Sequence, residues 1–380
     1  MSLIEVMVGI TVALIASLVV INAFSGSEAY KRTTTGASDA QQTAGVLSAY
    51  LSRVFQEAGS AIARGQGVIG CGVSLTNGTT TLWPRSAALD APFDKVPQTL
   101  RMAPAFVVAS SNAAGTPDSD TLVIMSGRPT ASPQDYPATY NTSLTFSPTP
   151  AILFNPSDYL LAFANPEIQE STSTTVPDCQ VLRVASSFAP TAVGTALAGY
   201  GGKPIGAAKS VVDLNADFGE PTVSTTGLSF LVRNLGAAPS LIALSRNDSG
   251  SLQQLNLLTN TTQTVAENIY AIKVLYGVDT DGNKVLGDAD WVTPTSTWTA
   301  ATLLDGKVST AAQAQQILAV RIGIVVRSSQ MVSSEAATPS VTVFPDKSSL
   351  KVTYNMSGDD ARYQYQVYDM TVPLQNLRGL

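Results

Sequence analysis

The chain begins with an apolar run, from Leu3 to Phe24, that holds a single carboxylate, Glu5. The run has about the length that a helix needs to cross ~30 Å of hydrocarbon. It is not a standard secretory signal, because no basic residue precedes it and no A-x-A cleavage site follows it. A plain membrane anchor would explain the run, but not Glu5, since an ionised carboxylate at membrane depth is costly and usually functional.

A helical pattern continues beyond this run. We predict one long helix with an apolar half over residues 1–28 and an amphipathic half over 29–64, roughly 90 Å long at 1.5 Å per residue. We expect Gly26 and Gly36 to bend or melt it locally. The apolar positions at helical spacing in the second half are Val46, Leu47, Tyr50, Leu51, Val54, Phe55, Ala58 and Ile62.

The remaining residues, 65–380, contain short β-type runs between turn-rich stretches, which predict antiparallel sheets. The expected fold class is therefore α+β, with the long helix packed on a β-rich globular head that could divide into two sub-lobes. The runs expected to form strands are 121–127, 151–154, 158–164, 179–185, 228–234, 240–246, 271–278, 317–328 and 363–374.

Composition argues against several classes of function. The net charge of −6 and the low charged fraction of 13% leave no basic field for nucleic acid. Histidine is absent, which removes the usual general base and the commonest transition-metal ligand. No nucleophile elbow is present and no Ser stands in a recognisable catalytic context, so we do not expect an enzyme. The two cysteines, Cys71 and Cys179, favour a single disulfide if the chain is exported, and two buried thiols are the alternative.

One acidic stretch, DTDGNKVLGDAD, alternates carboxylate and amide side chains in a way that suits Ca²⁺, which binds six to eight oxygen atoms. It differs from an EF-hand loop because Gly282 precedes Asn283 and because no Glu closes the loop. An acidic hairpin turn built on Asp-Gly is the alternative, and we expect no other cofactor. The candidate calcium ligands are Asp279, Asp281, Asn283, Val285, Asp288 and Asp290.

The start of the chain, MSLIEVMVGITVAL, resembles the mature start of type IV pilins and pseudopilins. Precursors in that family are cut after a Gly, which leaves Phe or Met, then Ser or Thr, Leu, an aliphatic residue and Glu. The resemblance implies that Met1 is N-methylated and that Glu5 pairs with the amino group of Met1 in a neighbouring subunit. No leader peptide precedes Met1, so we expect the mature form of the chain. Asn22 stands where many major pilins carry a Pro that kinks the helix.

Other stretches resemble PilW-type minor pilins in particular. They comprise 158–164 and 179–185, the distinctive stretch AENIYAIKVLYGVDTDGN at 266–283, the run AVRIGIVVRSS at 319–329 and the ending VPLQNL at 372–377. These stretches are spread over much of the chain, so the resemblance does not rest on the amino-terminal motif alone.

The resemblance implies a structural subunit of a type IV pilus or pilus-like filament, anchored in the bacterial inner membrane before assembly and extracellular afterwards. Its partners would be copies of itself or other pilins, the prepilin peptidase and the pilus assembly machinery. A low-copy minor pilin that primes or caps assembly is one alternative, and a secretion-system pseudopilin is another. Outside the family, a membrane-anchored binding protein remains open.

Overall fold

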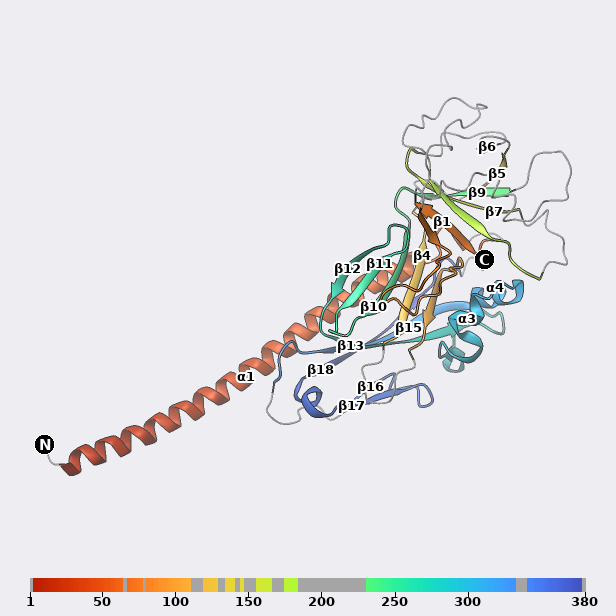
Figure 1. The fold of residues 1–380 in the computed structure, drawn as a ribbon. Helices are drawn as coiled ribbons and strands as arrows, with labels where there is room; N and C mark the ends of the chain where they lie inside the picture. The colour runs from red at the N-terminus through yellow and green to blue at the C-terminus, as the bar shows by residue number, and fades with distance from the viewer. Residues whose placement is uncertain are drawn as a thin grey trace.

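The computed structural model of the chain combines a projecting helix with a β-rich head (Figure 1). Helix α1 runs without interruption from Leu3 to Glu57, 55 residues or about 80 Å of helix. Its amino-terminal half projects away from the head, and its carboxy-terminal half lies against it. The structure describes residues 3–63, 67–77, 80–110, 119–128, 134–140, 144–146, 155–165, 174–183, 230–332 and 340–377.

The carboxy-terminal half of α1 is amphipathic, as the sequence predicts. Leu51 and Phe55 are fully buried, and this half packs on strands of the head that are described below. Val46 departs from the prediction, because its side chain is 64% exposed. Helical spacing in sequence places a residue near the packed stripe, and Val46 lies just outside that stripe. The other buried positions on this half are Ala40, Ala44, Leu47 and Val54.

Two details of α1 correct the sequence-based expectation. The helix passes through Gly26 and Gly36 without a break, and at Gly36 a Cβ atom would lie only 3.0 Å from that of Ser328. Gly36 therefore permits close packing on the head. The helix also ends at Glu57 rather than at residue 64, because Gly59 adopts a left-handed conformation with a φ of 76° that terminates a helix.

A four-stranded antiparallel sheet lies along this half of α1. Its strand order is β14 (Trp291–Val292), β13 (Ile269–Val278), β15 (Ile317–Arg327) and β18 (Tyr365–Pro373). The two central strands are apolar almost throughout, because both of their faces are covered. One face joins the core beneath α1, and the other packs on the hairpin β16 (Ser340–Val343) and β17 (Val352–Asn355). Gly323 makes this second contact possible, since a Cβ atom there would lie 2.0 Å from Val343 Cγ1.

A five-stranded antiparallel sheet forms the second layer of the head. Its order is β12 (Thr261–Ala266), β11 (Leu252–Asn256), β10 (Ser240–Arg246), β4 (Thr121–Ser126) and β3 (Ala105–Val108). The buried Asp120 joins this sheet to β13: its carboxylate accepts hydrogen bonds from the backbone of Ser110 and Val274, at 3.0 Å each, and from Lys273 Nζ at 3.1 Å. Burial raises the pKa of Asp120, and the Lys273 ammonium opposes that shift.

The third sheet has seven strands and lies at the end of the head farthest from the amino terminus (Figure 1). Its order is β2 (Thr80–Trp83), β1 (Val73–Asn77), β8 (Cys179–Arg183), β7 (Tyr159–Ala164), β9 (Phe230–Gly236), β5 (Asp135–Tyr140) and β6 (Leu144–Phe146). The β1–β8 pair is parallel, and the other pairs in this sheet are antiparallel.

The α+β class is therefore confirmed, and most of the expected strands are present. Each predicted run coincides with a strand to within a few residues, except 151–154, which lies outside the described residues. Short or polar elements were not anticipated. They include β1, β2, β3, β5, β6, β11, β12, β16 and β17, the helices α3 (Ala300–Leu303) and α4 (Val308–Gln315), and the 3-10 turns η2 (Asp288–Asp290), η3 (Ser296–Trp298) and η4 (Gly358–Arg362).

Candidate functional site

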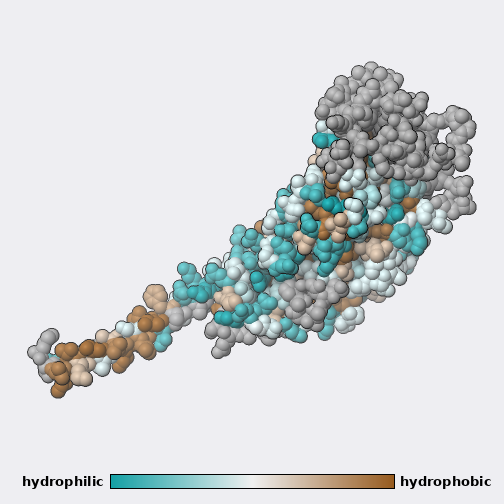
Figure 2. Space-filling model, in the orientation of Figure 1, coloured by the Kyte–Doolittle hydropathy of each residue, from teal (hydrophilic) through white to brown (hydrophobic). Residues whose placement is uncertain are grey.

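The amino-terminal half of α1 is the most unusual surface of the protein. Its large apolar side chains between Leu3 and Phe24 are 47–80% exposed, although such residues normally lie inside a protein. An 18-residue window of the helix has a mean hydropathy of 2.6, and none of that window is buried. By length and composition, α1 can cross a membrane. Figure 2 shows the apolar surface on this part of the helix, followed by a hydrophilic stretch toward the head.

Glu5 lies in the first turn of α1 and is exposed. The partial positive charge at a helix amino terminus favours a carboxylate at this position. If the apolar surface around it becomes buried, the carboxylate needs a cationic partner to offset the cost of desolvation. Met1, the predicted methylation site and the predicted source of that cation in a neighbour, lies outside the described residues. The pairing of Glu5 therefore stays a prediction.

The polar stretch of α1 begins where the apolar run ends. Glu28 and Arg32 form an exposed ion pair on successive turns, at 3.1 Å between Oε2 and Nη2. Exposed pairs of this kind contribute little to stability. They mark the place where the helix surface changes from one suited to an apolar environment to one suited to water.

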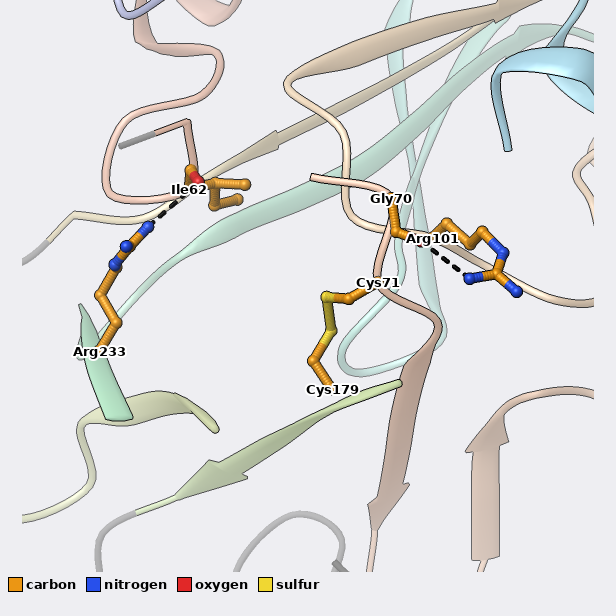
Figure 3. The surroundings of a disulfide bond; sticks show 6 residues. All are labelled: Ile62, Gly70, Cys71, Arg101, Cys179 and Arg233. Carbon is orange, nitrogen blue, oxygen red and sulfur yellow. Dashed lines mark hydrogen bonds between the residues drawn. A yellow bond between two sulfur atoms is a disulfide. The ribbon is translucent and has the colours of Figure 1, made fainter. Parts of the chain in front are cut away.

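The predicted disulfide is confirmed. Cys71 and Cys179, 108 residues apart in sequence, are bonded and buried (Figure 3). Cys71 lies two residues before β1, and Cys179 begins its parallel neighbour β8, where it pairs with Val73 in the sheet register. Arg101 stabilises the chain next to Cys71, because its Nη1 donates a hydrogen bond to the carbonyl of Gly70 at 2.8 Å. The bond therefore fixes the seven-stranded sheet to the chain that leaves α1.

The acidic loop after β13 is organised by hydrogen bonds within the loop. The Asp279 carboxylate accepts backbone N–H groups from Gly282, Asn283 and Lys284 at 2.8, 3.1 and 2.9 Å. Burial acts to raise the pKa of Asp279, but these hydrogen bonds hold it below its usual value. The Asp281 carboxylate binds the side-chain amide of Asn283 at 2.7 Å.

The side chains of the remaining candidate calcium ligands also bind groups of the protein itself. Asn283 Oδ1 accepts the Val285 N–H at 2.6 Å, Asp288 pairs with Lys347 Nζ at 2.6 Å, and Asp290 accepts the Gly287 N–H at 2.6 Å. Within the described part of the chain, no group of three or more His, Cys, Asp or Glu side chains is arranged to hold a metal ion. The geometry is that of a hydrogen-bonded acidic turn, so calcium binding here stays a prediction.

Sequence reasoning missed the two arginine clusters of the head. Arg233 is only 1% exposed and binds Asp135 through Nε and Nη2, at 2.6 and 2.7 Å. Arg321 binds Asp346 and Asp369 at the surface of the four-stranded sheet. The sequence shows only that each arginine stands inside an apolar strand. That position indicates an ion pair with a carboxylate, but it does not show which carboxylate.

Comparison with known proteins identifies one family. The sequence model of the family described as type IV pilus-assembly protein W matches residues 229–376. Comparison with curated proteins and with solved structures gives no significant match. The matched region contains β9 to β18, including the stretches 266–283 and 319–329 that suggested this family. The stretches 158–164 and 179–185 lie outside it. Residues 229–376 therefore match the PilW family, and this match supports a PilW-type protein related to type IV pilus assembly.

Proposed function

We propose that the protein is a structural subunit of a type IV pilus or a pilus-like filament. Before assembly the amino-terminal half of α1 would anchor it in the inner membrane, and after assembly the same half would pack in the filament core. The observation that carries the proposal is the exposed apolar surface between Leu3 and Phe24, at the end of a helix whose other half is fixed in the head.

The energetics favour such a transfer. Moving these side chains from lipid into a bundle of similar helices exposes little apolar surface to water, so it costs little hydrophobic free energy. Glu5 would make the transfer selective, because a subunit stacked in the wrong register would bury an unpaired carboxylate at a cost of several kcal/mol. The head would remain outside the core, where it is displayed to the medium.

Substitution of Glu5 tests this proposal. We expect Glu5→Ala to reduce the amount of sheared surface filament at least tenfold, while the protein still accumulates in the membrane. Glu28→Gln is a matched control, since it removes a carboxylate from the same helix outside the apolar run. Filaments at wild-type levels in the Glu5→Ala strain would refute the register role.

The family match favours a second candidate, a low-copy PilW-type subunit that primes or caps the filament. Quantitative mass spectrometry of sheared filaments separates the two candidates. A ratio near that of the major component supports a repeating subunit, whereas about one copy per filament supports priming or capping. A protein that stays in the membrane and never enters the filament would favour an anchored binding protein instead.

Our proposal assigns the protein no catalytic activity and no obligatory cofactor. We propose separately that the loop from Asp279 to Asp290 binds Ca²⁺, because its sequence is rich in side-chain oxygen atoms. Differential scanning calorimetry of the detergent-solubilised protein with Ca²⁺ and with EDTA tests it. An unchanged melting temperature would contradict calcium binding by this loop.

A further inference from the structure

The six residues directly after α1, residues 58–63, form a buried connection that we call the joint. The joint follows Glu57 and is almost entirely buried, although it has no regular secondary structure. It contains two left-handed positions, Gly59 and Ala61, with φ angles of 76° and 58°. The second is costly for a residue that is not glycine, so the surrounding contacts must hold it in place. These contacts come from all three large sheets.

The four-stranded sheet reaches the joint through Asn376, which lies just beyond β18. Its side-chain amide donates a hydrogen bond to the carbonyl of Ala58 at 2.9 Å, and it lies 3.4 and 3.5 Å from the carbonyls of Gln56 and Glu57. The last carbonyl groups of a helix have no partner within the helix. Asn376 therefore closes the carboxy-terminal end of α1.

The five-stranded sheet reaches the joint through β4 and the residues that follow it. The Gly59 N–H donates to the carbonyl of Met125 at 2.8 Å, and the Gly127 N–H donates to the carbonyl of Ser60 at 2.6 Å. Gly127 is required for this approach, because a Cβ atom there would lie 2.8 Å from that of Ala61. The joint is thus hydrogen-bonded beside the end of β4 much as an additional strand would be.

The seven-stranded sheet reaches the joint through Arg233 of β9. Its Nη1 donates to the carbonyls of Ala61 and Ile62 at 3.3 and 3.2 Å, and Figure 3 shows the side chain directed at Ile62. The same guanidinium binds Asp135 of β5 and lies over the ring of Phe163 in β7, at 5.1 Å from the ring centroid. A single buried side chain therefore links three strands of this sheet to the end of the helix.

We propose that the joint is a mechanical coupling that fixes α1 to each of the three sheets separately, and that Arg233 is the positioning residue for the seven-stranded sheet. A force or a rotation applied to α1 then reaches each sheet directly rather than by way of another sheet. The coupling follows from the contacts of the head alone. It holds whether the protein is a repeating subunit or a low-copy one.

Hydrogen exchange of the full-length protein in detergent micelles, followed by mass spectrometry, tests the coupling. In Arg233→Met we expect exchange to rise about ten- to a hundredfold in the joint and in β5 and β9, the factor that corresponds to losing hydrogen bonds to a charged group. Exchange in β13 and β15 should stay at the wild-type level.

Arg321→Met is the matched control, because Arg321 also binds both oxygens of one carboxylate, that of Asp346, and also stacks on an aromatic ring, that of Phe344 at 5.3 Å. Its effect should be confined to the hairpin of β16 and β17 and to β18. An equal rise in the joint in both variants would show general destabilisation and overturn the proposal. A rise in β5 and β9 with a protected joint in Arg233→Met would overturn it as well.

A second variant keeps the test decisive if Arg233→Met does not fold. Arg233→Lys retains the charge but loses the planar fork that spans Asp135 and the carbonyl of Ile62. We expect the same pattern of exchange with a smaller amplitude. Wild-type protection of the joint in a folded Arg233→Lys protein would contradict the role of the fork.

Discussion

The two halves of α1 form one continuous helix but have opposite environments. In the first half the large apolar side chains are 47–80% exposed, whereas in the second half Leu51 and Phe55 are completely buried. Both halves are helical, but the first is apolar on every side, whereas the second is apolar only along the stripe that faces the head. The second half therefore forms part of the hydrophobic core of the head. The first half would need an apolar environment from outside the chain to cover its side chains.

The largest effect should separate the two halves. Phe55→Ala is expected to destabilise the head by about 3–5 kcal/mol, because it leaves a cavity in a packed core. Leu14→Ala, on the exposed half, should change the unfolding free energy by less than about 0.5 kcal/mol. Urea unfolding of the detergent-solubilised protein, followed by tryptophan fluorescence to which the buried Trp83 contributes, measures both. Comparable losses in the two variants would contradict the division.

The disulfide should come next, because it stabilises the head and leaves the exposed half of α1 unaffected. Replacing Cys71 and Cys179 together with serine is expected to cost about 2–4 kcal/mol, since the bond closes a loop of 108 residues. Circular dichroism should show that α1 retains its helix while the thermal transition of the head moves down. A transition that does not move would mean that the sheets around β1 and β8 are stable without the bond.

A smaller effect is expected at the end of the packed half. Asn376→Ala should cost about 1–2 kcal/mol, because it leaves buried carbonyl groups at the end of α1 without their donor. Asn355→Ala, at the exposed end of β17, is a suitable control. Thermal unfolding of both variants measures the difference, and equal melting temperatures would show that water replaces the Asn376 amide.

The smallest effect concerns pH and lies away from α1. Burial acts to raise the pKa of Asp305, but hydrogen bonds from Lys307 and Thr310 lower it to about 2. Because the pKa in the folded state lies below that of the unfolded chain, the ionised carboxylate stabilises the fold above pH ~4. This contribution is lost as the pH falls toward 2.

Solvent screening limits the contribution of Asp305 to less than about 1 kcal/mol. Asp305→Asn should therefore flatten the stability profile slightly between pH ~4 and ~2. Denaturation curves measured across that range test the sign. A variant that is more sensitive to acid than the wild type would contradict it.

Residue patterns predict the parts of this fold whose environment is uniform. The runs that became β13 and β15 are recognisable because α1 and a hairpin cover both of their faces, which makes nearly every position apolar. The strand β12, with the sequence TTQTVA, is mostly exposed at the edge of its sheet, so its pairing with β11 comes from tertiary context. The end of α1 was misplaced because Ala58 and Ile62 continue the helical spacing although they are buried for another reason, in the joint.

Some features of the candidate site could likewise be predicted from sequence, and others could not. The exposed apolar half of α1 and the cysteine pair follow from sequence, because length, composition and an even cysteine count are sufficient. The partners of Arg233 could not be foreseen, since Asp135 and Ile62 lie 98 and 171 residues away along the chain. The hydrogen-bonded turn at Asp279 was one of two alternatives, and only backbone geometry shows how its carboxylate is used.

The bond between Cys71 and Cys179 also has a topological consequence. Residues 71 to 179 form a covalently closed ring that includes β4 and β7, so it contains strands from two different sheets. A protease that cuts once within this ring leaves α1 covalently attached to everything that follows residue 179. If the head is exposed to proteases, a single cut between residues 71 and 179 therefore does not separate the chain into two covalent pieces. The folded structure can hold the cut segments in place.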